Sequence, residues 1–336
     1  MNLPDAEYVE LYNRGDVSLQ LQGVGLASGG APQFLPEYIL DPGAYVLVVD
    51  DSDLADFQAL GPAIAVTSFA SLSNAADEIS LEINGQRDFF IAYTDKWYKD
   101  DARSEGGYSL ELSDLNPPYN CAGKWGASRA AAGGTPGAAN SLAGLVLDTV
   151  PPTLIRSFFA GSTLVLEFDE QLDRAAAEMV GNYFIGPDLN LTAAVLQSDE
   201  RTVILQLDAP PAPGQVYELN VFEEVVDCVG NRPAEFIGRN VGLPQEVAVG
   251  DVVLNEILFN PGTGGVDFVE LFNCSGKIFN VRGWRLLNDQ QTSGGIEETI
   301  GSDYLFFPGA YLVITPDVDD ILGRYPAASR EQLLEN

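Results

Sequence analysis

The feature that most constrains this chain is an internal duplication, in which a twenty-residue pattern occurs twice without a gap. It runs over residues 7–26, EYVELYNRGDVSLQLQGVGL, and over residues 267–286, DFVELFNCSGKIFNVRGWRL, so equivalent positions differ by 260. A second anchor follows each copy, PGAYVLVV at 42–49 and PGAYLVIT at 308–315, with an offset of 266. The duplication predicts that two segments far apart in the chain build the same fold.

The local patterns favour β-structure throughout. Apolar and polar residues alternate over 8–11 and 19–24, and residues 45–49 form a nearly all-apolar run typical of a buried strand. Residues 79–83 alternate in the same way, and Asn84-Gly85 then supplies the two positive-φ positions of a type I′ hairpin turn. With 34 Gly and 20 Pro in 336 residues, the composition also fits packed strands joined by turns.

Three segments follow from the repeats and from a proline-rich stretch between them. The run DTVPPT at 148–153 disfavours helix and is typical of an interdomain linker. After it, alternation recurs at 164–168, 203–207 and 217–221, with one or two helical turns expected over 174–180. We therefore predict domains at 1–147, 148–244 and 245–336.

The motifs of the first segment resemble, in order, the lamin-tail domain of bacterial secreted proteins. The matching strings are EYVELYN, PGAYVLVV, SLSNAADEISL, DFFIAY followed by Trp97, GGYSLEL, KWGAS and GGTPGAANS. They cover nearly all of residues 1–141, and NEILFNP, DFVELFN and PGAYLVI repeat the first half of the domain within residues 250–315. The resemblance implies an immunoglobulin-like β-sandwich used as a non-catalytic module, and it transfers no catalytic residue.

The middle segment is similar to a different family, the bacterial Ig-like domain of surface-layer and adhesin-type proteins. The similarity is carried by LVLEFDEQLD, GNYFI, GQVYELNV and VVDCVGN. Together the two resemblances imply an all-β protein of tandem immunoglobulin-like β-sandwiches. The first copy lacks the NEILFNP strand and the second copy ends part-way, so we expect the sequence to be a fragment of a longer chain.

The charge and the missing residue types exclude several functions. The net charge of −32 is spread over the chain, with 20 acids against 7 bases in 1–147, 15 against 5 in 148–244 and 14 against 5 in 245–336. Such a surface repels phosphate backbones, so we expect no nucleic-acid partner. Histidine is absent, which removes the commonest general base and the commonest transition-metal ligand. No apolar run is long enough to span a membrane.

The three cysteines, Cys121, Cys228 and Cys274, lie far apart and without zinc or thioredoxin-like spacing. Two interpretations remain open: one disulfide with an odd thiol, or three buried thiols.

Calcium is the one cofactor for which the sequence offers ligands. Asp50, Asp51 and Asp53 crowd at the end of a predicted strand, where hard oxygen ligands could hold the ion. The alternative is the solvated acidic start of a short helix at Leu54. Asp148, grouped with the acids of 169–173, is a second candidate site.

Two further sets of residues invite a functional reading, but a structural one is favoured for each. Glu10 and Glu270 occupy the same repeat position, three residues before Asn13 and Asn273, and could be imagined as catalytic carboxylates. A strand glutamate capping loop amides, followed by an asparagine in a left-handed turn, explains the pattern without chemistry. Three tryptophans could likewise form a platform on which a carbohydrate stacks: Trp97, Trp125 and Trp284. Packing in the core or at strand ends is the favoured interpretation.

The sequence therefore predicts no catalytic residues and no enzyme. We expect a non-catalytic extracellular or cell-surface module of a larger secreted protein, which acts in spacing, display or adhesion through an unspecified protein or glycan. The alternative is an accessory region of a secreted hydrolase (nuclease, esterase or protease) whose catalytic domain lies outside these residues. A further hypothesis is strand exchange between chains, because the first copy lacks a strand that the second copy has.

Overall fold

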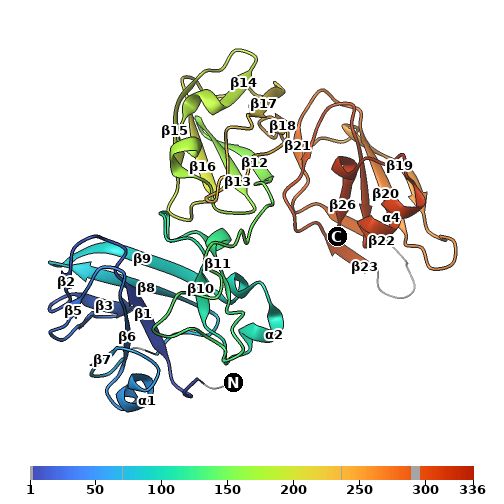
Figure 1. The fold of residues 1–336 in the computed structure, drawn as a ribbon. Helices are drawn as coiled ribbons and strands as arrows, with labels where there is room; N and C mark the ends of the chain where they lie inside the picture. Colours follow the sequence, from blue (N-terminus) through green and yellow to red (C-terminus); the bar gives the residue numbers. More distant parts are fainter. Residues whose placement is uncertain (1–2, 70, 236, 289–295) are drawn as a thin grey trace. The chain divides into compact units, whose positions relative to one another are not determined.

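The computed structural model describes residues 3–69, 71–235, 237–288 and 296–336, and it confirms the predicted all-β fold class. The chain divides into two compact units. Figure 1 labels the strands and helices that build them. The first contains residues 1–151 and 227–231, and the second contains residues 152–226 and 232–336. Residues 227–231 belong to the middle segment of the sequence but group with the first unit. Among the described residues, no helix has the length and apolar character needed to cross a membrane.

The first unit is a β-sandwich. One sheet has the order β1 (Tyr8–Tyr12), β6 (Tyr45–Asp50), β7 (Ala63–Val66), and the other has the order β4 (Gln33–Phe34), β3 (Gly25–Ser28), β8 (Ala76–Ile83), β9 (Gln86–Thr94). Their facing side chains form one core, to which β6 contributes Val46 and Val48 and β3 contributes Leu26. Smaller elements complete the unit: β2 (Leu19–Gln20) with β5 (Ile39–Leu40), β10 (Leu110–Leu112) with β11 (Trp125–Ala127), α1 (Leu54–Gln58) and α2 (Asp101–Ser104).

Local predictions for this unit can be compared with its structure. The hairpin turn is confirmed, because Asn84 and Gly85 have φ values of 55° and 74° and join β8 to β9. The buried strand at 45–49 is confirmed as β6. The helix after it is α1, but it ends at Gln58, and the Asp53 side chain makes no capping hydrogen bond.

The second unit begins with another two-sheet arrangement. Its sheets have the orders β12 (Leu154–Ala160), β13 (Thr163–Phe168), β16 (Thr202–Leu207), β15 (Leu191–Leu196), and β14 (Tyr183–Gly186), β17 (Tyr217–Val221), β18 (Ile237–Val241). The predicted alternation at 164–168, 203–207 and 217–221 puts every second side chain into one large core. The predicted helical turns are present as the single turn α3 (Arg174–Ala177).

The rest of the second unit is built from the second copy of the repeat. Its main sheet has the order β19 (Val252–Leu258), β20 (Phe268–Asn273), β25 (Tyr311–Thr315), β26 (Leu333–Glu335). Two small pairs and a helix accompany it: β21 (Phe279–Asn280) with β24 (Leu305–Phe306), β22 (Arg285–Asn288) with β23 (Ile296–Thr299), and α4 (Val318–Arg324).

The two copies form the same sheet in the same register. In the first repeat Leu11 of β1 faces Val46 of β6, and in the second Leu271 of β20 faces Leu312 of β25. These pairs are related by the offsets of 260 and 266 seen in the sequence. In each repeat a helix then leads to a parallel strand, β7 or β26. The structure thus confirms that two distant segments of the chain each build the same fold.

Candidate functional site

Glu10, the carboxylate that the repeat pattern singled out, holds a loop in the first unit. Its Oε2 accepts a hydrogen bond of 2.5 Å from the backbone N–H of Gly137, 127 residues away. Gly137 has a φ of 75°, and a Cβ there would lie 3.2 Å from the Cα of Gly61, so the position requires glycine. The prediction that this strand glutamate caps a loop amide is confirmed.

Burial strongly affects the ionisation of Glu10. It raises the pKa of this carboxyl to about 7, with the Gly137 hydrogen bond opposing the rise and the nearby Glu111 charge adding to it. A carboxyl with a pKa near neutrality has the ionisation needed in a general base. Here, however, the carboxylate of Glu10 holds a backbone loop through the N–H of Gly137, and this arrangement is called the clasp below.

Glu111 on β10 is the second carboxylate of this clasp, and sequence reasoning missed it. Its side chain is 3% exposed and accepts hydrogen bonds from Ser141 Oγ at 2.6 Å, Thr135 Oγ at 3.0 Å and the N–H of Leu142 at 3.3 Å. The sequence signal that could have found it is the alternation Leu110-Glu111-Leu112, which places an acidic residue between two apolar residues of a strand. Glu10 and Glu111 therefore secure the segment from Thr135 to Leu142 against the sandwich.

Glu270, at the equivalent position of the second repeat, has a different partner. Its Oε1 accepts a hydrogen bond of 2.5 Å from Asn255 Nδ2 on the neighbouring strand β19. Asn255 lies at a β-bulge between Leu254 and Glu256. The prediction of a capped loop amide is therefore wrong for Glu270, whose partner is a side-chain amide on a neighbouring strand, and it holds for Glu10 alone.

The repeated asparagines make equivalent pairs of hydrogen bonds through Nδ2, and each such pair is called a staple below. Asn13 Nδ2 donates to the carbonyl oxygens of Val17 at 2.8 Å and Leu40 at 2.9 Å. Asn273 Nδ2 donates to the equivalent carbonyls of Lys277 at 2.8 Å and Phe306 at 3.1 Å. The expected left-handed backbone is wrong, because neither asparagine has a positive φ. The position selects asparagine for its buried side-chain amide instead.

The predicted calcium ligands lie where β6 leads into α1. Asp50 Oδ1 accepts hydrogen bonds from the N–H and Oγ of Ser52, and Oδ2 accepts one from the N–H of Phe69. These bonds lower the pKa of Asp50 to about 2 and keep it charged. Asp53 precedes α1 and Asp51 is exposed. Both carboxylate oxygens of Asp50 thus already accept hydrogen bonds, one from the local turn and one from a segment 19 residues away, and calcium binding here stays a prediction.

Two of the acids proposed as a second site, Asp169 and Asp173, hold backbone N–H groups, and calcium binding by this set stays a prediction. In the second unit, Asp169 accepts a hydrogen bond from the N–H of Thr153 at 2.8 Å, and Asp173 caps α3 through the N–H of Ala176 at 2.8 Å. In the first unit, a carboxylate oxygen of Asp148 lies within 4.8 Å of one from Asp227.

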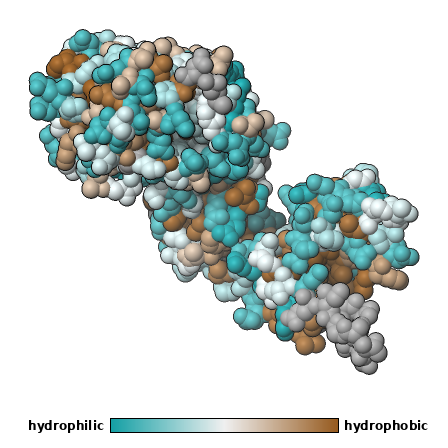
Figure 2. All heavy atoms as spheres, turned by 90° about the horizontal axis from the view of Figure 1, so that it is seen from below, coloured by the Kyte–Doolittle hydropathy of each residue, from teal (hydrophilic) through white to brown (hydrophobic). Residues whose placement is uncertain are grey.

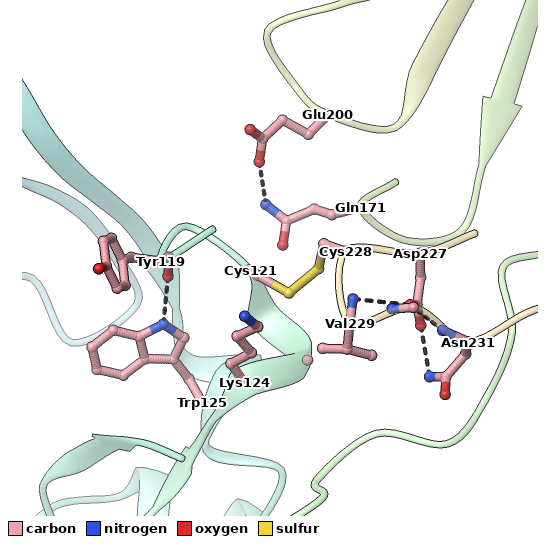
Figure 3. Close-up of a disulfide and its surroundings, with 12 residues drawn as sticks. Tyr119, Cys121, Lys124, Trp125, Gln171, Glu200, Asp227, Cys228, Val229 and Asn231 are labelled. Atoms are coloured by element: carbon pink, nitrogen blue, oxygen red, sulfur yellow. Dashed lines mark hydrogen bonds between the residues drawn. A yellow bond between two sulfur atoms is a disulfide. The ribbon is translucent and has the colours of Figure 1, made fainter. Parts of the chain in front are cut away.

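Asp227 organises the loop of residues 227–231, which groups with the first unit (Figure 3). Its Oδ1 accepts hydrogen bonds from the N–H groups of Val229, Gly230 and Asn231, and Oδ2 accepts one from Asn231 Nδ2. The side chain is fully buried, and burial raises the pKa of Asp227 against the effect of these bonds. The carboxylate therefore acts as the centre of a compact turn.

The same loop carries a disulfide between Cys121 and Cys228, whose Cα atoms are 5.8 Å apart and 107 positions apart in sequence (Figure 3). Cys274 is exposed and unpaired with another cysteine. Of the two interpretations left open by the sequence, the structure has one disulfide and one thiol.

The tryptophans pack as the structural interpretation predicted. Trp97 is 5% exposed and lies 6.2 Å from Trp125 between ring centroids. Trp125 is held further by a hydrogen bond of 2.8 Å from Nε1 to the carbonyl oxygen of Tyr119. Trp284 packs on Phe279, and it also borders a polar cavity of about 290 Å³ lined in addition by Glu246 and Arg282.

No family model matches the chain, and no curated protein matches it. Solved structures that are similar include the N-terminal part of the bacterial S-layer protein SbsC, with a TM-score of 0.26 and 12% identity over 49% of this chain and 40% of that chain. A longer structure, rSbsC(31-844), gives the same values over 32% of its length. The chain thus spans less than half of each, and the lamin-tail resemblance stays a prediction.

Proposed function

We propose that this chain is a non-catalytic extracellular or cell-surface module of a larger secreted protein, which spaces or displays other parts or binds a protein or glycan. The observation that carries this proposal is that the polar residues considered as candidate functional groups make structural hydrogen bonds. The carboxylates of Glu10 and Glu111 and the amides of Asn13 and Asn273 hydrogen-bond to neighbouring segments of their own repeats. These groups stabilise a scaffold.

Two properties support the location and the class of partner. Disulfides persist in oxidising compartments, and Cys121–Cys228 joins the loop of residues 227–231 to the rest of the first unit. Hydrophilic residues cover most of the visible face in Figure 2, in keeping with the net charge of −32. A negative surface of this kind favours solubility and disfavours phosphate-rich partners, which leaves proteins and neutral or basic glycans.

The test combines a thiol count with an activity screen on the full chain. After export to an oxidising compartment and denaturation without reductant, we expect one reactive thiol, that of Cys274, and three would contradict the proposed location. Nuclease, esterase and protease substrates should show no turnover. Turnover that Glu10→Gln or Glu111→Gln abolishes in a folded protein would overturn the non-catalytic role. Binding to immobilised glycans and to cell envelopes would then identify the ligand class.

Calcium at Asp50, Asp51 and Asp53 remains a separate proposal. A ligand that binds only the folded state raises its melting temperature. A rise at millimolar calcium that Asp51→Asn reduces would support the site, and an unchanged melting temperature would reject it.

A further inference from the structure

The polar cavity of about 290 Å³ in the second unit is formed by the second repeat and the segment that leads into it. One wall comes from residues 244–247, and the other comes from side chains within residues 280–284. The leading segment is tied to the repeat, because the N–H of Gln245 donates to the carbonyl oxygen of Ile278 at 2.7 Å. The cavity therefore belongs to one hydrogen-bonded region.

Two side chains of the second wall are held in place by Asp303. Asn280 Nδ2 donates to Oδ1 of Asp303 at 2.7 Å, and Arg282 Nη1 donates to Oδ2 at 2.9 Å. Asn280 Oδ1 in turn accepts hydrogen bonds from the N–H groups of Arg282 at 3.1 Å and Tyr304 at 3.3 Å. These bonds order the wall before a ligand arrives, which reduces the conformational entropy lost on binding.

Other polar groups of the cavity keep unused hydrogen-bonding capacity. Within the part of the chain that the structure describes, no acceptor is found for Nε1 of Trp284, and no partner is found for the carboxylate of Glu246. Oε1 of Gln245 is buried without a hydrogen-bond donor from the described residues, which is unfavourable. A rotation that turned this oxygen toward a ligand hydroxyl would supply the missing donor. The cavity thus offers both donors and acceptors to a ligand.

The first repeat shows which of these positions serve the fold. Gln20 takes the place of Asn280 and accepts the same two backbone hydrogen bonds, so this position stabilises the turn. Trp284 stands where the first repeat has Val24, which packs against the core of the first sandwich. The fold therefore requires only an apolar side chain at this position. The larger indole of the second repeat packs on Phe279 and also borders the cavity.

An aromatic ring beside hydrogen-bond donors and acceptors has the chemistry that recognises a sugar. A hexose has a face of C–H groups that packs on an aromatic ring and a rim of hydroxyls that both donate and accept. Glu246 and Arg282 have opposite charges, and the net charge of −32 on the chain disfavours an anionic ligand. Both residues are exposed, so the cavity opens to solvent. Its volume is at the lower end of small-ligand sites, which suits one sugar unit of a longer glycan.

We propose that this cavity binds one neutral hexose or N-acetylhexosamine unit of a glycan, an inference that rests on the proposed function and specifies its ligand. The indole of Trp284 packs against the C–H face of the sugar. Arg282 donates to hydroxyls through the N–H groups that Asp303 leaves free. Glu246 and Gln245 accept hydrogen bonds from hydroxyls at the opposite wall.

The test is fluorine NMR of the full chain labelled with fluorotryptophan and titrated with the methyl glycosides of glucose, galactose, mannose and N-acetylglucosamine. The chain has three tryptophans, and Trp284→Phe assigns the resonance of interest. At least one glycoside at millimolar concentration should shift the Trp284 resonance to saturation and leave those of Trp97 and Trp125 in place. A Trp284 resonance that no glycoside moves would overturn the proposal.

Two exposed positions of the cavity supply the binding-deficient variants. Arg282→Gln introduces the residue that the first repeat has at position 22, so the fold should be kept while hydrogen bonds to the sugar are lost. It should weaken binding roughly tenfold, and Glu246→Gln should also weaken it. Arg330→Gln removes an exposed arginine outside the cavity and is the matched control, which should bind like the wild type. Wild-type affinity in both cavity variants would reject the site.

The remaining outcomes separate this site from the proposed function. If only the Trp97 or Trp125 resonance moves, or if Arg282→Gln still binds immobilised glycans like the wild type, glycan binding is real but this site is rejected. Tighter binding of methyl glucuronide than of every neutral glycoside would reject the neutral ligand class. Absence of binding to the glycosides, to immobilised glycans and to cell envelopes would reject both this site and a binding function.

Discussion

The two repeats share a sheet but differ in what closes it. In the first, the sheet built on β1 and β6 is held to the segment 135–142 by Glu10 and Glu111, and the unit contains the Cys121–Cys228 disulfide. In the second, the same glutamate position contacts β19, and the local cysteine, Cys274, is free. The comparison shows that the repeated pattern encodes the paired strands and the asparagine hydrogen bonds. The partners of the repeated glutamate come from residues outside the pattern and differ between the repeats.

The largest expected difference between the repeats comes from the disulfide. Replacing Cys121 and Cys228 with Ser should lower the free energy of unfolding of the first unit by about 3–4 kcal/mol, because the bond restricts a long loop in the unfolded chain. Denaturant titrations can follow the first unit by Trp97 and Trp125 and the second repeat by Trp284. The transition reported by Trp284 should move less, because residue 284 lies outside the loop that the disulfide closes, and Cys274→Ser should leave both transitions unchanged. Equal shifts of both would break the comparison.

Removing the staple should instead affect the two repeats alike. Asn13→Ala deletes the two bonds that Nδ2 donates and the one that Oδ1 accepts from the N–H of Gly15. Asn273→Ala deletes the two that Nδ2 donates and the two that Oδ1 accepts from the N–H and Oγ of Ser275. Each substitution removes the side-chain donor to a buried carbonyl, that of Leu40 or of Phe306. We expect a loss of about 2–4 kcal/mol in the corresponding transition. Asn116→Ala, on an exposed turn, is the control and should stay within about 0.5 kcal/mol of the wild type. Losses that differ greatly between the repeats would show that the staples are not equivalent.

The pH dependence of the first repeat should depend on Glu10. Its pKa is raised from 4.5 to about 7, so between these values the folded chain keeps a proton that the unfolded chain has released. This contribution to stability is full below pH 4.5 and is lost as the pH rises through about 7. With allowance for solvent screening, the change is about 1–2 kcal/mol.

Denaturation of Glu10→Gln between pH 4 and pH 8 measures this contribution. The substitution should flatten the profile of the first unit, and Glu270→Gln, its matched control, should not alter that profile. A Glu10→Gln profile with the wild-type slope would assign the pH dependence to other groups.

The smallest predicted effect concerns a turn that both repeats share. Gly43 and Gly309 have φ values of 73° and 70°, and nothing lies within 4 Å of an added Cβ. Ala at either position should therefore cost about 1 kcal/mol from backbone strain alone. Gly276 also has open space but no positive φ, and its equivalent in the first repeat is Asp16, so Gly276→Ala should be nearly neutral. Unequal costs at Gly43 and Gly309 would show that the turns have diverged.

Much of the fold could be predicted because its determinants are local. The apolar run of β6, the alternation of β8 and the Asn84-Gly85 turn each depend on residues close in sequence. The duplication extended these local inferences to a second region, since equal patterns have equal strand registers. The role of Glu10 followed from the same reasoning, as a strand carboxylate with a backbone partner.

The sequence by itself thus determined the all-β class, the repeat and the residues that would matter within it. Only the tertiary structure decided that Glu10 meets Gly137, that Glu111 joins the clasp and that Cys121 pairs with Cys228. It also decided that Asn13 is selected for a bond to Leu40 and not for a left-handed turn. The physical reason is the same in each case: these contacts join residues tens to more than a hundred positions apart, and periodicity and turn chemistry carry no information over that distance.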